Sequence, residues 1–176
     1  MMNSFVTVRI YIVFTILVAF WCAGILAAPA MKHSGFNGSA DMAYTFFSRV
    51  CHQSDMRSFH VEGEKFGVCI RCSAIYFGFF FGLVLMPFFG VLKRKSMPKP
   101  MLILAVIIPM VVDVMLNDTG LHGSTVMTRV VTGLFFGGGM SWCVVPIFIE
   151  ACSQIICRKK IHSLDFGVTS YVRKTQ

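Results

Sequence analysis

The sequence predicts an all-α integral membrane protein, a bundle of four transmembrane helices with a small extracytoplasmic cap that contains cysteine and histidine. Of its 176 residues, 56% are hydrophobic and only 14% are charged, and the mean hydropathy is +0.72. Soluble domains carry about a quarter charged residues. The apolar residues form four long runs, and one compact bundle uses the whole length, so we expect a single domain.

The net charge of +8 does not indicate nucleic-acid binding. Lysine and arginine cluster just after the hydrophobic runs instead of alternating with aromatic residues along one face. This pattern is typical of orientation signals and of contacts with anionic lipids. We therefore expect a lipid bilayer, and no nucleic acid, as the partner.

The first span is expected at residues 5–28, where only Arg9 interrupts the apolar run. Such a run crosses a hydrocarbon core of about 30 Å. The triplet Ala28-Pro29-Ala30 resembles a signal-peptide cleavage site, but the run is longer than a usual signal sequence, which favours an uncleaved helix. Both interpretations place the following segment across the membrane.

The outward loop is expected at residues 29–69. Ser39 or Asp41 is expected to cap a short helix that runs through Gln53. Its apolar side either lies along the membrane interface or packs on a small core of the loop itself. The sequence leaves both alternatives open.

The remaining spans are expected at residues 70–92, 101–117 and 126–152, followed by a flexible basic tail at 153–176. In the second span, Ala74, Gly78 and Gly82 recur at four-residue spacing. Small residues in register allow another helix to approach closely.

The distribution of lysine and arginine predicts the orientation. The turn at residues 93–99 holds four and the tail holds five, whereas the four in residues 29–68 are balanced by four acidic residues. The positive-inside rule places both termini and the 93–99 turn in the cytoplasm. We expect a multi-pass protein of the inner (plasma) membrane, with the Cys51–Cys72 stretch and the 117–126 loop facing outward.

Three cysteines and two histidines fall within the Cys51–Cys72 stretch. A C-x-x-C pair, Cys69 and Cys72, with the more distant Cys51 and either His52 or His60, would form a tetrahedral Cys₃His set for zinc or iron. One alternative is a structural disulfide, which leaves an odd thiol; another is a reactive dithiol. The metal set that we favour uses His52.

Charged and polar residues within the last two spans form a second group. Asp113 lies about one turn before the end of its span, with Asn117 one turn further on the same face. Arg129 is the expected counter-ion of Asp113, with Arg71 as the second choice. Asp113 and Arg129 are candidate catalytic residues; the alternative is a structural clamp between two helices.

Three residues are candidates for binding a substrate or an anion: Arg57, Arg71 and Asn117. The guanidinium group suits a phosphate or a carboxylate. Contact with lipid headgroups explains the arginines equally well.

The chain resembles an uncharacterised family of small prokaryotic membrane proteins, one of the domains of unknown function. The resemblance rests on Cys-His-Gln at 51–53, Arg-Ser-Phe at 57–59, Cys-x-Arg-Cys at 69–72 and Tyr-Phe-Gly at 76–78, with Asp113 and the Arg129, Thr132, Gly133 group further on. It covers residues 44–140. It implies a multi-span membrane protein and no particular activity.

A weaker resemblance is to disulfide-forming quinone oxidoreductases, which are small four-helix membrane proteins with an outward C-x-x-C at the start of the second span. Cys69 and Cys72 occupy the corresponding place. The chain departs from that pattern because the 117–126 loop carries no second cysteine pair.

These observations favour a membrane protein with an outward metal site, acting as a metal-dependent enzyme on a lipid or lipid-linked substrate. The first alternative is thiol–disulfide exchange with a quinone through Cys69 and Cys72. The second is a non-enzymatic assembly or transport component. The sequence does not fix the oligomeric state.

Overall fold

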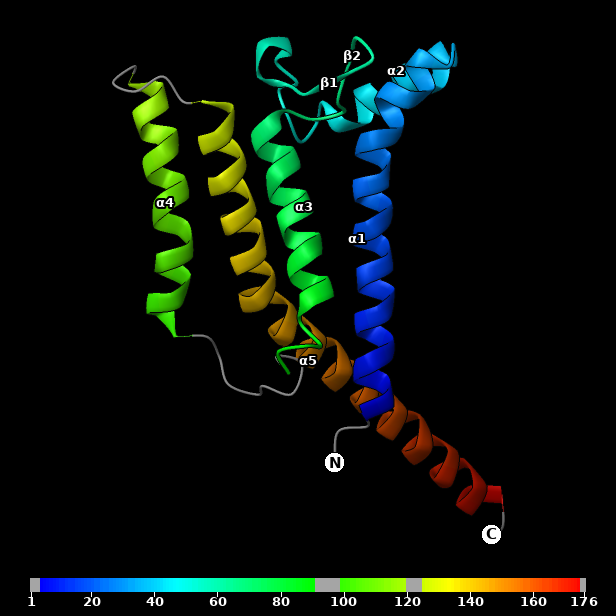
Figure 1. The fold of residues 1–176 in the computed structure, drawn as a ribbon. Helices are drawn as coiled ribbons and strands as arrows, with labels where there is room; N and C mark the ends of the chain where they lie inside the picture. The colour runs from blue at the N-terminus through cyan, green and yellow to red at the C-terminus, as the bar shows by residue number, and fades with distance from the viewer. Residues whose placement is uncertain (1–3, 91–98, 120–124, 175–176) are drawn as a thin grey trace.

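A computed structural model describes residues 4–90, 99–119 and 125–174 (Figure 1). The elements, in chain order, are α1 (Ser4–His33), α2 (Asn37–Phe47), the 3-10 turn η1 (Asp55–Arg57), the strands β1 (His60–Val61) and β2 (Glu64–Lys65), α3 (Ile70–Leu85), α4 (Pro100–Asp118) and α5 (Val126–Lys174). Helices α1, α4 and α5 contain apolar stretches long enough to cross a membrane. The fourth apolar helix, α3, has 16 residues and a length of about 24 Å. The predicted all-α membrane bundle is confirmed.

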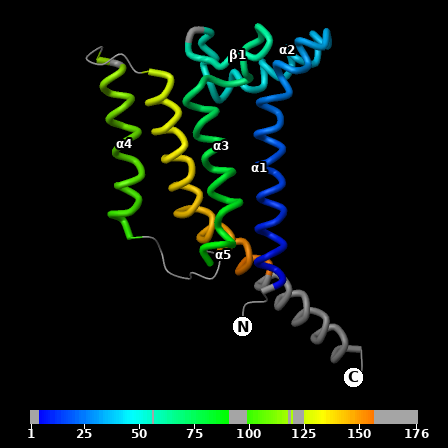
Figure 2. The backbone as a smooth tube through the Cα atoms, in the orientation of Figure 1, coloured from blue at the N-terminus to red at the C-terminus, as the bar shows by residue number. Residues whose placement is uncertain are grey.

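Helices α1, α3, α4 and α5 run alongside one another, and one end of the bundle carries α2 and the β1–β2 hairpin (Figures 1 and 2). This is called the cap end below. Helices α1 and α4 finish there, and α3 and α5 begin there. At the opposite end α5 continues past the bundle to Lys174, so the segment expected as a flexible tail is helical. Lys93, Arg94 and Lys95 of the expected basic turn lie outside the described residues.

Helices α3 and α5 pack backbone against backbone. A Cβ atom added to Gly137 would lie 2.1 Å from the carbonyl oxygen of Ile75, and one added to Gly78 would lie 2.5 Å from that of Leu134. Neither distance is sterically allowed, so glycine is required on both sides of this contact. The expectation that small residues in the second span admit another helix is confirmed.

Two prolines free a carbonyl for a tertiary contact, because proline has no N–H to donate to the residue four positions earlier. Pro29 lies inside α1, and the freed carbonyl of Ile25 accepts the N–H of Gly67 at 3.3 Å. Pro87 follows α3 four residues after Leu83, whose carbonyl accepts the Tyr11 hydroxyl at 2.6 Å besides the Met86 N–H at 3.1 Å. The first contact ties the cap to α1.

The cap has a small apolar core. Helix α2 follows Phe36, which makes no side-chain capping bond, and it ends at Phe47; the expected capping by Ser39 or Asp41 and the extension to Gln53 are wrong. Phe47 is buried and its ring meets Trp21 of α1 edge-on at 5.4 Å between ring centroids. The apolar side of α2 thus packs on a core that α1 and the loop share, and its position along the membrane interface stays a prediction.

Candidate functional site

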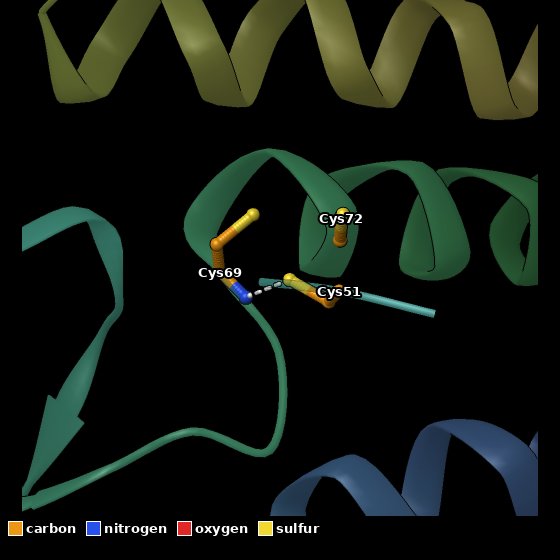
Figure 3. A group of neighbouring side chains, drawn as sticks. All are labelled: Cys51, Cys69 and Cys72. Carbon is orange, nitrogen blue, oxygen red and sulfur yellow. Dashed lines mark hydrogen bonds between the residues drawn. The ribbon is translucent and has the colours of Figure 1, made fainter. Parts of the chain in front are cut away.

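Three thiols meet beneath the cap (Figure 3). The sulfur atoms of Cys51, Cys69 and Cys72 all lie within 4.8 Å of one another, and the three cysteines are free of disulfides. Cys51 is buried and the other two are half-buried. We call these residues the thiol cluster.

The start of α3 positions two of these sulfurs. Cys69 is the N-cap of α3 with an extended backbone, and Cys72 lies in the first helical turn, so the C-x-x-C spacing brings both side chains to the same helix end. Cys51 reaches them from the preceding loop. Its sulfur accepts the backbone N–H groups of Cys69, at 3.2 Å, and of Gln53, at 3.4 Å. The two amide donors hold this sulfur beside the start of α3.

The pKa of the Cys69 thiol is lowered by its neighbours. A hydrogen bond from the Cys72 side chain lowers the pKa of Cys69 from its ordinary value of 9.0 to about 5, against the opposing effect of burial. The Cys72 N–H, the Cys51 side chain and the Arg71 N–H add to the lowering. The lowered pKa favours the thiolate of Cys69, the form of cysteine that attacks electrophiles and binds metals.

Gln53 holds the loop that carries Cys51, and sequence reasoning missed this role. Its backbone has a positive φ of 48°, and its side-chain nitrogen donates to the carbonyl oxygens of Tyr44, at 2.8 Å, and of Gly67, at 2.7 Å. The side chain therefore bridges α2 and the segment between β2 and Cys69. The only signal in the sequence was its place next to Cys51 and His52.

The two candidate histidines lie elsewhere. His52 is exposed and is not part of the thiol cluster. His60 is in β1, and its Nε2 lies 3.3 Å from an Asp55 carboxylate oxygen. In the described part of the chain, no His, Asp or Glu joins the three sulfurs. Tyr76, one turn after Cys72, is within electrostatic range of all three, and sequence reasoning did not single it out as a site residue.

The charged group is assembled differently from the expectation. Asp113 forms its ion pair with Arg71, the second choice, and Arg129 instead donates to the amide oxygen of Asn117 at 3.3 Å. The residue of α5 that is level with Asp113 is Thr132, whose hydroxyl lies 3.5 Å from an Asp113 carboxylate oxygen. Arg129, three residues earlier, therefore lies about one turn nearer the cap end. Arg71, in the first turn of α3, fills the position left for a cation.

Arg57 joins this group from the cap. It ends η1, is exposed, and acts electrostatically on the Arg129 guanidinium, as does Arg71. Cys69 also acts on Arg129, so this group and the thiol cluster adjoin. We call Arg57, Arg71 and Arg129, with Asp113 and Asn117, the arginine cluster. The catalytic and anion-binding roles of these residues stay predictions.

An apolar hollow opens between α1 and α3 next to the thiol cluster. Its volume is about 360 Å³, and it is lined by Leu17, Val18, Trp21, Ile75, Tyr76 and Phe79. Tyr76 therefore belongs to the wall of the hollow and to the surroundings of the sulfurs. A hydrophobic molecule in this hollow would lie within one helical turn of Cys72.

Residues 51–143 match the family described as "Predicted membrane protein (DUF2085)". The chain belongs to this family. An uncharacterized protein of Methanocaldococcus jannaschii is 36% identical to it over 107 residues, which cover 61% of this chain and 69% of that protein. An uncharacterized protein of Methanothermobacter thermautotrophicus is 31% identical over 98 residues, which cover 54% of this chain and 84% of that protein. No solved structure matches the chain.

The family match begins at Cys51 and ends at Cys143. It therefore contains every residue of the thiol cluster and of the arginine cluster. Helices α1 and α2 lie outside it, although α1 supplies half of the apolar hollow and the carbonyl that holds Gly67. The region shared with the family is thus the part of the molecule where the two clusters meet.

Proposed function

We propose that this protein binds one zinc or iron ion at the membrane surface through the thiolates of Cys51, Cys69 and Cys72. The observation that carries the proposal is the approach of three sulfurs to within 4.8 Å of one another. Tetrahedral zinc–thiolate bonds of about 2.3 Å require sulfur–sulfur distances of about 3.8 Å. Small side-chain rotations bring the three sulfurs to that separation.

The chemistry of the donors fits such an ion. Ligating cysteines must be deprotonated, and soft thiolates select zinc and iron over harder cations. The lowered pKa of Cys69 favours its thiolate before any ion arrives, and two backbone N–H groups hold the Cys51 sulfur beside it. A staple between two cysteines would leave the third without a role.

The fourth ligand of a tetrahedral ion determines whether the ion is structural or catalytic. Three protein ligands with one open position are typical of catalytic zinc, which polarises its bound water or a substrate carbonyl. Closure by His52 would make the site structural, and it requires the exposed imidazole to turn inward. We favour the open arrangement and a lipid or lipid-linked substrate, with Asp113 and Arg129 at its polar end.

Elemental analysis of the purified full chain tests the proposal. We expect about one zinc or iron ion per chain, released by Cys69→Ser and kept by Cys143→Ser, which removes a buried thiol in α5 remote from the cluster. Thiol counts before and after denaturation accompany the measurement. Wild-type protein that contains no metal and has Cys69 joined to Cys72 would refute the metal site.

The apolar hollow favours a second candidate, thiol oxidation by a quinone. The Cys69 thiolate and the Cys72 thiol would lose two electrons and the Cys72 proton to form a disulfide, and the quinone would take up the two electrons, that proton and one proton from water to become a quinol. The hollow beside Tyr76 suits the quinone ring and the start of its tail. Reduced protein mixed with a soluble quinone would then lose two thiols per quinol formed, and Cys72→Ser would form no quinol.

We also propose that the cap end faces away from the cytoplasm of a plasma membrane. The proposal rests on the lysine and arginine counts. A reporter fused after Lys95 is expected to be cytoplasmic, and one inserted near Gly38 external. An external signal from the Lys95 fusion would reverse the orientation.

A further inference from the structure

We propose that the arginine cluster is a binding site for a phosphate group, carried either by a lipid headgroup or by a free phosphate. The proposal goes beyond the metal site and does not depend on it. It rests on the convergence of three guanidinium groups from the cap, α3 and α5 on one place at the cap end.

The positive charges at this place outweigh the described negative ones. The groups that act on the Arg129 guanidinium are, in decreasing order, Arg57, Arg71 and the carboxylate of Asp113, followed by Cys69. Among the described residues, three guanidinium groups thus share one carboxylate, that of Asp113. Like charges held close together in a partly buried site are costly unless an anion joins them.

Hydrogen-bond donors remain available for such an anion. Arg57 is exposed, and its guanidinium group makes no hydrogen bond or ion pair with the described residues; only its backbone N–H is bonded, to the Ser54 carbonyl at 3.0 Å. Arg71 uses one terminal nitrogen for Asp113, while its buried Nε finds no acceptor in the described part of the chain. The Nε–H and a terminal N–H lie side by side on one edge of a guanidinium group, the fork that binds two oxygens of a phosphate.

The position within the fold also suits a lipid phosphate. Arg71 and Arg129 lie in the first turns of α3 and α5, whose N-terminal ends carry partial positive charge. Asp113 lies five residues before the end of α4, about 7.5 Å into the helix. Only 18% of the Arg71 side chain and 10% of the Asp113 side chain are exposed. The donors thus lie near the level where headgroups meet hydrocarbon, with Arg57 toward the water.

Thermal unfolding of the full chain in neutral detergent micelles tests the site. Inorganic phosphate, compared with chloride at equal ionic strength, and phosphatidic acid, compared with phosphatidylcholine, are titrated separately. We expect at least one phosphate-bearing probe to raise the unfolding midpoint, because a ligand that binds the folded state stabilises it. Stabilisation by both means that a phosphate group suffices. Stabilisation by phosphatidic acid alone assigns a lipid headgroup, and by inorganic phosphate alone a free anion.

Arg57→Gln and Arg49→Gln separate this site from general attraction of anions. Both remove one exposed arginine of the cap, but only Arg57 acts on Arg129. We expect Arg57→Gln to weaken the apparent affinity about tenfold, as the loss of one charge-assisted hydrogen bond does, and Arg49→Gln to leave it unchanged. Equal losses in the two variants, or no stabilisation by either probe, would overturn the proposal.

Discussion

The thiol cluster and the arginine cluster adjoin at the cap end, but they are held in different ways. The thiol cluster is local: its three cysteines lie within 22 residues, and backbone N–H groups and the Gln53 side chain keep them in place. The arginine cluster draws on α3, α4, α5 and the cap, and its members meet only through the packing of those helices.

The difference has a physical consequence. The thiol cluster can be disturbed by releasing the cap while the bundle stays intact. The arginine cluster depends on the register between helices, and the close contact of α3 with α5 sets that register. Changes in the helix contacts should therefore alter the arginine cluster first, and changes in the cap should alter the thiol cluster first.

The largest effect is expected for Asp113→Asn. It leaves Arg71 as a mostly buried charge without its carboxylate, at a cost of about 3–5 kcal/mol in the free energy of unfolding. Reversible denaturation in mixed micelles measures the loss. Metal content per folded chain should stay unchanged, because the thiol cluster does not use this pair.

The double variant Arg71→Gln with Asp113→Asn separates a structural pair from a working one. Removal of both charges should recover most of the lost stability. If the pair serves only packing, expression of the double variant should also rescue any phenotype of cells that lack the protein. We expect stability without that rescue. A double variant as unstable as Asp113→Asn alone would show that the pairing with Arg71 is wrong.

Gly137→Ala is expected to have the next largest effect. The added Cβ would overlap the Ile75 carbonyl, so α3 and α5 must separate, at a cost of about 1–3 kcal/mol. The separation should also weaken the effect of phosphate on the unfolding midpoint. Gly38→Ala in α2, where the new Cβ meets no atom within 4 Å, is the matched control and should change little.

Gln53→Ala is expected to disturb the thiol cluster and to leave the arginine cluster intact. It removes two hydrogen bonds that hold the cap, which should cost about 1–2 kcal/mol and lower the metal affinity. The response to phosphate should be largely retained. Gln154→Ala on the exposed surface of α5 is the control. Unchanged metal affinity in Gln53→Ala would mean that the loop does not need this side chain.

The smallest perturbation is a change of pH. With the pKa of Cys69 lowered from 9.0 to about 5, its thiolate stabilises the folded state fully above about pH 9, and this contribution is lost as the pH falls through about 5. Alkylation of Cys69 by iodoacetamide in chelator-treated protein should therefore persist down to about pH 5. In the detergent-unfolded chain, alkylation of Cys69 should already decline as the pH falls below about 9. Identical profiles would contradict the acidic thiol.

The sequence was sufficient to predict the class of fold and the proximity of the three thiols. Long apolar runs predict membrane helices because the bilayer sets their length, and the C-x-x-C pair at the start of α3 predicts two sulfurs at one helix end. The role of Gln53 could not be predicted, since it depends on a positive φ and on carbonyl groups 9 and 14 residues away.

The partner of Asp113 could not be predicted for a different reason. Arg71 and Arg129 both lie at the start of helices, and the composition of each span leaves its vertical offset free. An offset of one turn, about 5.4 Å, exchanges one arginine for the other. The side-chain directions that place His52 outside the cluster are equally invisible in the spacing of the motif.

Pro29 makes α1 depend on the cap for one hydrogen bond. Without Gly67, the Ile25 carbonyl lacks the donor that the fourth residue after it supplies in an ordinary helix, so α1 alone is one hydrogen bond short at the cap end. The loop that satisfies it is synthesised next and leads directly into α3. The bond from Gly67 to α1 thus also holds the chain two residues before Cys69, so a helix outside the family match helps to place one of the three sulfurs.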